Sequence, residues 1–315
     1  MHEHVAPPRV SVCITTYGHD AFIEACVRSV LDQAADATLE VLVGEDASPD
    51  GTRKILRRLA DGEPRLRLVL HDRNVGPTRN LSGLVTMASG DFIAHLDGDD
   101  LWYPGKLAAQ LERLASDPAM VACYSNALVV EGDGSVLGTF SRGLPSTLGS
   151  HDLLRRGNRL CHSSLIYRAR DRDAILGVAP PYIDYRLHLR LLARGRLGYV
   201  DAPLVGYRWR TPGSMTTTMP SALVDGHLDA FQEALIAKAA PEDILGAIGA
   251  FWGKVLVKGL LGLNLATPRQ VAEALRGLGV PGLTSSWLAR QSLLALPRAL
   301  RSVLSRRLPP RVYFP

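Results

Sequence analysis

One pattern repeats through the first 120 residues and limits the folds available: a short apolar run is followed by a stretch with helical spacing of apolar residues. In the first repeat the β-branched segment Arg9–Thr15 leads into a periodic stretch that ends near Gln33. Three further runs, each followed by a predicted helix, lie at residues 39–45, 65–71 and 91–96. This repetition predicts an α/β fold, Rossmann-like, with a mainly parallel sheet covered by helices, and such sheets bind ligands at the carboxyl ends of their strands.

After residue 120 the regular alternation stops. We predict strands at 120–130 and 163–168, a helix from Asp184 to Ala193, and a hairpin-like pair at 197–200 and 204–209. Beyond Ser214 the sequence indicates helices separated by prolines, with no further strand pattern. The prediction is therefore an α/β domain over residues 1–214, with halves at about 9–120 and 121–214, and a basic helical C-terminal extension over 215–315.

The charge of the chain is unevenly distributed. The net charge is +5, but from Lys254 onward there are ten Lys or Arg and one acid, Glu273, against 26 basic and 30 acidic residues before that point. The C-terminal segment is thus +9 and the remainder −4. This asymmetry argues against a basic groove for nucleic acid and favours a separate cationic C-terminal element. Apolar residues alternate with arginines over 284–311, so we expect this element to bind an anionic membrane surface or to self-associate.

The sequence favours a cytoplasmic location. Its four cysteines lie far apart without zinc-ligand spacing, and the first ten residues lack the features of a signal peptide. The most apolar candidate span, residues 244–266, contains Lys254 and Lys258, and we expect it to be a buried or interfacial helix. The expected location is the cytoplasm, with the inner face of the cell membrane as a possible peripheral site.

An acidic turn follows the fourth predicted strand. Asp97, Asp99 and Asp100 place three carboxylates within four residues, and this concentration of charge is costly unless it is solvated, hydrogen-bonded or bound to a cation. Oxygen ligands suit Mg²⁺ or Mn²⁺, which leave positions open for substrate phosphates. The alternative is an acidic turn that caps the helix starting near Pro104. The chain contains no glycine-rich phosphate loop, so another device would have to bind phosphate.

Polar side chains also stand at the ends of the other predicted strands. Thr15 and Tyr17 end the first, Asp46 ends the second, and Arg79 follows the third. An Asp can accept a hydrogen bond from a base or ribose, a Tyr can stack on a base, and an Arg can anchor a ring or a phosphate. Each also has a structural explanation, as a helix cap, a packing aromatic or a solvated cation. The four strand ends are expected to meet at one edge of the sheet.

In the order and spacing of four segments, residues 10–33, 39–52, 74–110 and 181–210, the chain resembles glycosyltransferase family 2, whose catalytic domain has the GT-A fold. The resemblance covers roughly residues 9 to 210. It implies that Thr15, Tyr17, Asp46 and Arg79 hold the nucleoside of a nucleotide sugar. It further implies that Asp97 lies near the ribose or phosphate, and that Asp99, with Asp97, holds the metal that bridges the diphosphate.

The resemblance also implies a catalytic base in the second half of the chain. Asp184 matches the family's catalytic Asp, whereas Ile183 stands where the family usually has Glu. A helix cap is the structural alternative for Asp184. Glu45 and Ala47 replace the commoner Asp and Gly around Asp46, and the His often found near Arg208 is missing. Arg208 and Arg210 are candidates to neutralise the departing nucleotide, with solvated edge residues as the alternative. His162 is a candidate for contact with donor or acceptor, or a structural histidine.

The sequence therefore predicts an inverting, metal-assisted glycosyltransferase of polysaccharide or glycoconjugate biosynthesis. Its donor would be a nucleotide sugar, with UDP as the expected nucleotide. Its acceptor would be the hydroxyl of a glycan, a lipid-linked glycan or a small molecule, and Mg²⁺ or Mn²⁺ would be the cofactor. Two alternatives remain at this point: a nucleotidyltransferase on a related fold, and a non-catalytic carbohydrate-binding or scaffold protein with a decayed transferase fold.

Overall fold

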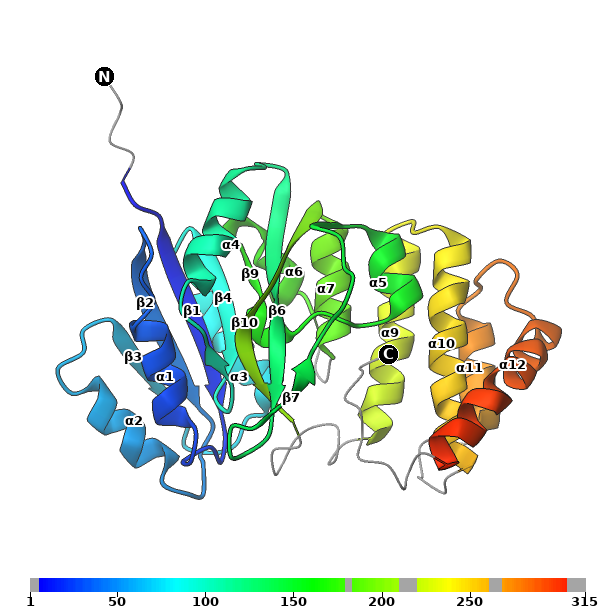
Figure 1. Cartoon of the computed structure of the whole chain (residues 1–315), viewed down its shortest axis with the longest axis horizontal. Coiled ribbons are helices and arrows are strands. Elements are labelled where there is room, and N and C mark those ends of the chain that lie inside the picture. Colours follow the sequence, from blue (N-terminus) through cyan, green and yellow to red (C-terminus); the bar gives the residue numbers. More distant parts are fainter. Residues whose placement is uncertain (1–5, 179–182, 210–219, 261–267, 305–315) are drawn as a thin grey trace. The chain divides into compact units, whose positions relative to one another are not determined.

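The computed structural model describes residues 6–178, 183–209, 220–260 and 268–304 (Figure 1). The chain divides into two compact units. The first comprises residues 1–147, 160–180 and 194–212, and the second comprises 148–159, 181–193 and 213–315. The first unit contains the sheet, and the second is mainly helical. The domain boundary predicted at residue 214 lies outside the described residues and stays a prediction.

The sheet has the strand order β3-β2-β1-β4-β9-β6-β10-β5, with β7 paired to β6 and β8 paired to β10. Its strands are β1 (Arg9–Thr16), β2 (Thr38–Glu45), β3 (Leu66–Leu70), β4 (Phe92–Asp97), β5 (Leu101–Trp102), β6 (Met120–Val130), β7 (Val136–Thr139), β8 (Thr147–Leu148), β9 (Ile166–Arg168) and β10 (Arg196–Arg208). The predicted α/β class is confirmed. The sheet is mixed, because the antiparallel β9 joins a parallel set of four strands to the parallel pair of β6 and β10.

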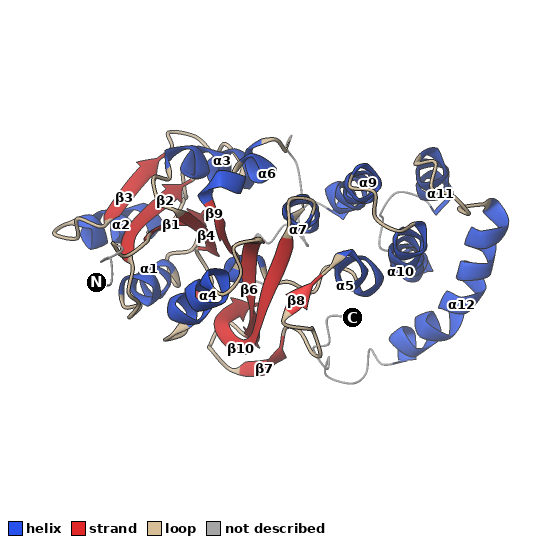
Figure 2. Ribbon diagram, turned by 90° about the horizontal axis from the view of Figure 1, so that it is seen from above, coloured by secondary structure: helices blue, strands red, loops and turns tan. Residues whose placement is uncertain are grey.

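The parallel half of the sheet is buried between two layers of helices. The helices of the first unit are α1 (Ile23–Leu31), α2 (Thr52–Ala60), α3 (Pro77–Met87), α4 (Lys106–Ala115) and α6 (Asp173–Leu176), with 3₁₀ turns η1 (His162–Ser164) and η2 (Ala169–Asp171). Figure 2 shows α3 and α6 on one face of the sheet and α1 and α4 on the other. Val12 and Ile14 of β1 have no exposed surface, as expected for a β-branched strand covered on both sides.

The predicted hairpin at 197–200 and 204–209 is wrong. Both runs belong to the single strand β10, which pairs in parallel with the long buried strand β6 along its whole length. The pairing shifts register on both sides of Pro203. Proline lacks the amide hydrogen that the ladder needs, and a local irregularity lets the strand continue past it. The break in the sequence pattern thus marks a bulge and not a turn.

The strand predicted at 163–168 is shorter than expected. Its first two residues, Ser163 and Ser164, belong to η1, and β9 begins at Ile166. The Ser164 hydroxyl donates to the carbonyl oxygen of Cys161 at 2.7 Å. Such local side-chain bonds to the backbone compete with strand pairing.

The second unit is built around α10 (Pro241–Leu260), whose residues Ile244, Ile248 and Val255 are buried. Around it pack α5 (Ser150–Arg156), α9 (Pro220–Ile236), α11 (Pro268–Gly277) and α12 (Ser285–Leu304), and α7 (Asp184–Leu192) packs on α9. The helices predicted beyond residue 214 are therefore present. Among the described residues, none of the helices combines the length and the apolar character that a membrane crossing requires.

Candidate active site

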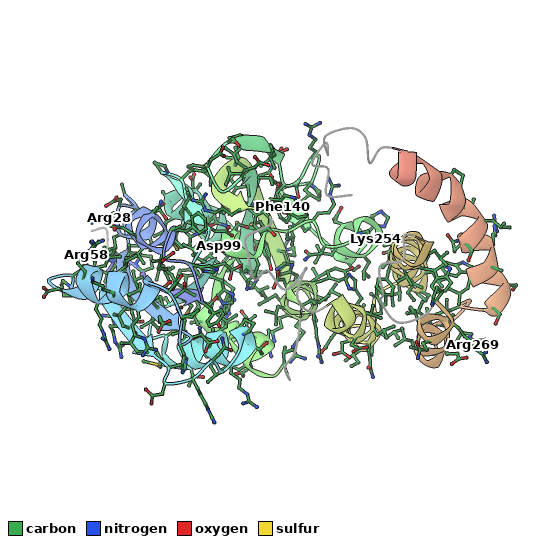
Figure 3. The ribbon with its side chains drawn as sticks, turned by 90° about the horizontal axis from the view of Figure 1, so that it is seen from below. Arg28, Arg58, Asp99, Phe140, Lys254 and Arg269 are labelled. Atoms are coloured by element: carbon green, nitrogen blue, oxygen red, sulfur yellow. The ribbon has the colours of Figure 1, made fainter. Side chains whose placement is uncertain are left out.

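The carboxyl ends of the parallel strands meet at one edge of the sheet. Thr15 of β1 is in register with Gly44 of β2 on one side and with Asp97 of β4 on the other. Glu45 of β2 is in turn in register with Leu70 of β3. β1 runs downward in Figure 1, so Figure 3, seen from below, looks onto this edge, where Asp99 is labelled. The strand pairing confirms that the four ends lie together.

The acidic turn between β4 and β5 is bonded to the end of β1. The Thr15 hydroxyl donates to Asp97 Oδ1 at 3.2 Å, and the amide of Gly98 donates to the Thr15 carbonyl oxygen at 2.8 Å. A Cβ atom at position 98 would lie 2.6 Å from Thr16 Oγ1 and 2.9 Å from His19 Nδ1. The turn thus needs glycine at this position, and its fit against β1 fixes where Asp97 and Asp99 emerge.

Asp100 turns inward and is 2% exposed. Its carboxylate accepts hydrogen bonds from the Ser163 hydroxyl at 2.5 Å and from the Arg208 amide at 2.7 Å. Burial raises the pKa of Asp100 well above its usual range, and the negative charges of Asp99 and Asp97 raise it further. Asp100 is therefore a structural carboxyl group that joins the turn to η1 and to the end of β10.

Arg208, a predicted donor-site residue, is brought to the acidic turn. Besides its amide bond to Asp100, its guanidinium carbon lies 4.3 Å from the centroid of the Phe22 ring. Its Nη1 donates to the Glu131 carbonyl oxygen at 3.3 Å. The backbone of Arg208 is thus bonded to the acidic turn, while a cation–π contact with Phe22 holds its guanidinium. Arg210 lies outside the described residues.

The acidic turn fits an open divalent-metal site. Asp97 and Asp99 are half-buried at the sheet edge, whereas the Asp100 carboxylate is buried and hydrogen-bonded to Ser163 and Arg208. Among the described residues, no group of three or more His, Cys, Asp or Glu side chains is arranged to hold a metal ion. Mg²⁺ is commonly bound through one or two carboxylates together with substrate phosphates. Carboxylates held this close together repel one another, and a bound cation relieves repulsion of this kind.

Asp46 organises the loop that precedes α3. It is 2% exposed, and its carboxylate accepts the amide hydrogens of Val75 at 2.7 Å and Gly76 at 3.0 Å. The loop leads into α3, whose first turn carries the exposed Arg79. Tyr17, just beyond β1, is 47% exposed. The structure thus ties Asp46 to the segment that carries Arg79 and leaves the Tyr17 ring accessible.

Two residues beside Asp46 explain how the end of β2 is built. Glu45 is fully buried and accepts from the Ser48 amide and from Arg53 Nε, each at 2.5 Å. Ala47 has φ of 59°, a left-handed conformation that favours glycine. The departures from the family pattern at these positions are therefore accommodated by an ion pair and by local backbone strain.

Sequence reasoning missed two partners of the site. Arg53 of α2, which binds Glu45, is not among the candidate residues of the sequence analysis, although a basic residue eight positions after the acid was an available signal. Ser163 bonds to Asp100 from 63 residues away, so no local pattern indicated the contact. His162 lies with its Nε2 atom 3.1 Å from His95 Nδ1.

Asp184 lies in the second unit. It is the exposed first residue of α7, and the N-cap position is occupied by the buried Ile183. No side-chain hydrogen bond caps this helix. Two residues further on, Arg186 binds Asp229 at 2.8 Å and Glu233 at 3.0 Å, both on α9. The start of α7 is therefore fixed to α9 while the Asp184 carboxylate faces solvent.

Sequence comparison places the chain among known enzymes. The family model described as glycosyl transferase family 2 matches residues 11–163. TuaG of Bacillus subtilis, whose name assigns it to glycosyl transfer in teichuronic acid biosynthesis, is 31% identical over 206 residues, which cover 64% of this chain and 79% of TuaG. The UDP-Glc:α-D-GlcNAc-diphosphoundecaprenol β-1,3-glucosyltransferase WfaP of Escherichia coli is 28% identical over 59% of this chain and 71% of its own length.

Solved structures share the fold. Residues 1–349 of Staphylococcus aureus TarS, in complex with UDP-GlcNAc, superpose with a TM-score of 0.69 at 17% identity over 94% of this chain and 92% of that one. The mannosyltransferase PcManGT of Pyrobaculum calidifontis, in complex with GDP-Man and Mn²⁺, gives 0.51 at 20% identity over 96% and 90%. The chain belongs to glycosyltransferase family 2. It is a glycosyltransferase with a GT-A fold. This excludes the two alternatives that the sequence left open, a nucleotidyltransferase and a non-catalytic protein.

The strain at Ala47 predicts a stabilising substitution. Ala47→Gly should raise the free energy of unfolding by about 0.5–1 kcal/mol, because glycine adopts positive φ without the clash of a Cβ atom, offset in part by its larger unfolded-state entropy. The control is Ala108→Gly on an exposed position of α4, which should lower the free energy of unfolding by about 1 kcal/mol. Urea unfolding of both variants measures this, and a loss at position 47 equal to that at 108 would contradict the prediction.

Proposed function

We propose that this glycosyltransferase transfers a sugar from a UDP-sugar to an acceptor hydroxyl with inversion, in the synthesis of a polysaccharide or glycoconjugate. The observation that carries the proposal is the acidic turn, which is bonded to β1 at the edge where four strand ends meet. The similarity to TarS, solved with UDP-GlcNAc, and to WfaP, whose name contains a UDP-Glc donor and a lipid-linked acceptor, supports the choice of donor and makes a lipid-linked acceptor the first to test.

In this proposal the nucleoside lies at the ends of β1 and β2. The exposed Tyr17 ring offers a face for the base, and Thr15 lies beside Asp97. Asp46 accepts two backbone amides, but a carboxylate has about four acceptor positions, so it can also accept from the nucleoside. Arg79 completes the nucleoside side, and Arg208, with Arg210, supplies positive charge for the diphosphate.

Mg²⁺ or Mn²⁺ would be held by Asp99 with Asp97, and when bound it would neutralise charge on the leaving diphosphate. In the transfer step the acceptor oxygen attacks the anomeric carbon on the face opposite the nucleotide. A carbon–oxygen bond to the acceptor forms while the bond from that carbon to the diphosphate oxygen breaks. The Asp184 carboxylate takes the proton of the acceptor hydroxyl, and Arg208 stabilises the charge of the released nucleotide.

The metal assignment predicts the effect of Asp99→Ala. This variant should lose hydrolysis of a UDP-sugar panel in Mn²⁺, because the buried Asp100 cannot take over the lost coordination. Adding a chelator to the parent should have the same effect. The matched control is Asp91→Ala, which removes an exposed acid just before the amino end of β4 and should leave hydrolysis intact. Full activity of Asp99→Ala, or of the parent in chelator, would refute the assignment.

The base assignment predicts that Asp184→Asn binds UDP as the parent does but transfers sugar about 10²- to 10⁴-fold more slowly. Transfer is measured with radiolabelled UDP-sugars and the acceptor found by screening lipid-linked and small hydroxyl compounds, and UDP affinity is measured by calorimetry. Asp173→Asn is the control, because Asp173 is likewise the exposed first residue of a helix, α6. Equal transfer rates for the two variants would show that Asp184 has only a structural role.

We also propose that α12 binds an anionic lipid surface on the cytoplasmic side of the membrane. Leu293 and Leu294 are 68% and 56% exposed, and Arg290 is exposed one turn before them. Exposed leucines beside a cation suit the acyl boundary of an anionic leaflet, where each basic residue adds about 1 kcal/mol of attraction. The excess of basic residues from Lys254 onward supports this choice of partner.

Vesicle co-sedimentation tests this proposal. The protein should bind vesicles containing phosphatidylglycerol, less strongly at high salt, and the double variant Leu293→Gln with Leu294→Gln should bind several-fold more weakly. Truncation is unsuitable because Leu288 is buried and Ser292 accepts a hydrogen bond from Trp252. Ile236→Gln, at another exposed apolar position, is the control. If the parent instead forms dimers that the double variant abolishes, and binds no vesicles, the surface serves self-association.

A further inference from the structure

The acidic turn is held by one buried hydroxyl group from a distant part of the chain. Ser163 of η1 donates to Asp100 Oδ2 at 2.5 Å and accepts from the Asp97 amide at 3.2 Å. A serine hydroxyl has one donor and two acceptor positions, so both bonds form at once. Ser163 is 1% exposed, which leaves no place for bulk water to replace it. The two ends of the turn that carries Asp99 are therefore fixed to the same atom.

The position of Ser163 is itself fixed by two buried donors. Trp102 Nε1 donates to the Ser163 carbonyl oxygen at 2.9 Å. Gln110 Nε2 donates to the carbonyl oxygens of Ser164 at 2.9 Å and Cys123 at 3.1 Å. These bonds attach η1 to β5, to α4 and to β6. The hydroxyl of Ser163 is thus presented to the turn by a rigid part of the core and not by a surface loop.

A buried lysine orders both donors. Lys106 has no exposed surface; its Nζ donates to Gln110 Oε1 at 2.7 Å and lies 3.7 Å from the centroid of the Trp102 ring. Burial lowers the pKa of Lys106 to about 7. The bond to Gln110 fixes which amide atom faces Lys106, and so directs the Nε2 group toward η1. A buried polar group such as the Lys106 amine destabilises the fold unless it is hydrogen-bonded. Its contacts with Gln110 and Trp102 fit a role in positioning these two side chains.

We propose that Ser163 is the positioning residue for metal binding: it sets the conformation of the turn so that Asp97 and Asp99 face the same cation. This inference rests on the proposed metal site. Without the hydroxyl, the buried Asp100 carboxylate keeps only the Arg208 amide, and the Asp97 amide loses a partner. Buried groups left unpaired favour rearrangement of the segment that carries them. The two metal-binding carboxylates then lose their preorganisation.

The experiment measures Mn²⁺ affinity directly, from the electron paramagnetic resonance signal of free Mn²⁺, in the presence of UDP. Ser163→Ala should bind Mn²⁺ about 10- to 100-fold more weakly than the parent, the range typical of residues that orient metal ligands. Ser163→Cys, which keeps a donor at this position but a larger and weaker one, should give an intermediate loss. Ser125→Ala is the matched control, because it removes a hydroxyl from β6 that is equally buried and bonds to the Asn126 carbonyl oxygen.

The outcomes separate this inference from the metal assignment. A loss for both Ser163 variants with parental affinity for Ser125→Ala supports the positioning role. Equal affinity of Ser163→Ala and Ser125→Ala overturns it while leaving the metal site in place. A parent that binds no Mn²⁺ with UDP, or binds it as Asp99→Ala does, overturns the metal assignment and this inference with it. If Ser163→Ala does not fold, Ser163→Cys decides, and parental Mn²⁺ affinity of that variant overturns the positioning role.

Discussion

A carboxylate buried beside two other carboxylates is the constraint on which this site depends. Asp100 has almost no exposure, and the effective cost of burying an unpaired charge is several kcal/mol. Hydrogen bonds from the Ser163 hydroxyl and the Arg208 amide, 63 and 108 residues further on, offset part of that cost. The turn between β4 and β5 therefore takes its shape only when η1 and the end of β10 are in place. The shape of the acidic turn therefore depends on the whole sheet and not on its parallel half alone.

The same edge is built by close approach of backbone segments. A side chain at Gly98 would meet Thr16 and His19, and one at Gly44 would meet the side chain of Asn80. Asn80 uses the space at Gly44 to donate to its carbonyl oxygen at 2.8 Å. These contacts draw the ends of β1, β2 and β4 and the start of α3 together. Polar side chains can therefore converge there without the glycine-rich phosphate loop that the sequence lacks.

The sequence predicted what is local and periodic. The strands at 9–15, 39–45 and 120–130 and the helix at Asp184 follow from β-branched runs and helical spacing, and the structure has them. It failed where the decisive contact is distant. The two halves of β10 looked like a hairpin because Pro203 interrupts the pattern, whereas the long buried strand β6 pairs with both. Ser163 looked like the start of a strand, and only tertiary contact with Asp100 reveals its environment.

The family match covers only some of the candidate site residues. The matched residues, 11–163, include the acidic turn, Asp46 and the hydroxyl that holds Asp100, but not Asp184 or Arg208. The acidic turn and Asp46 therefore fall within the family match, as do the departures at Glu45 and Ala47, whereas the departure at Ile183 lies beyond it. Ile183 packs on α9, where a Cβ atom at Gly226 would lie 2.8 Å from its Cγ2 atom. Ile183 is thus an apolar residue at a position where the family usually has an acid. The start of α7 is anchored by the packing of Ile183 on α9 and by the ion pairs of Arg186. Within the second unit, α9 therefore fixes the start of α7.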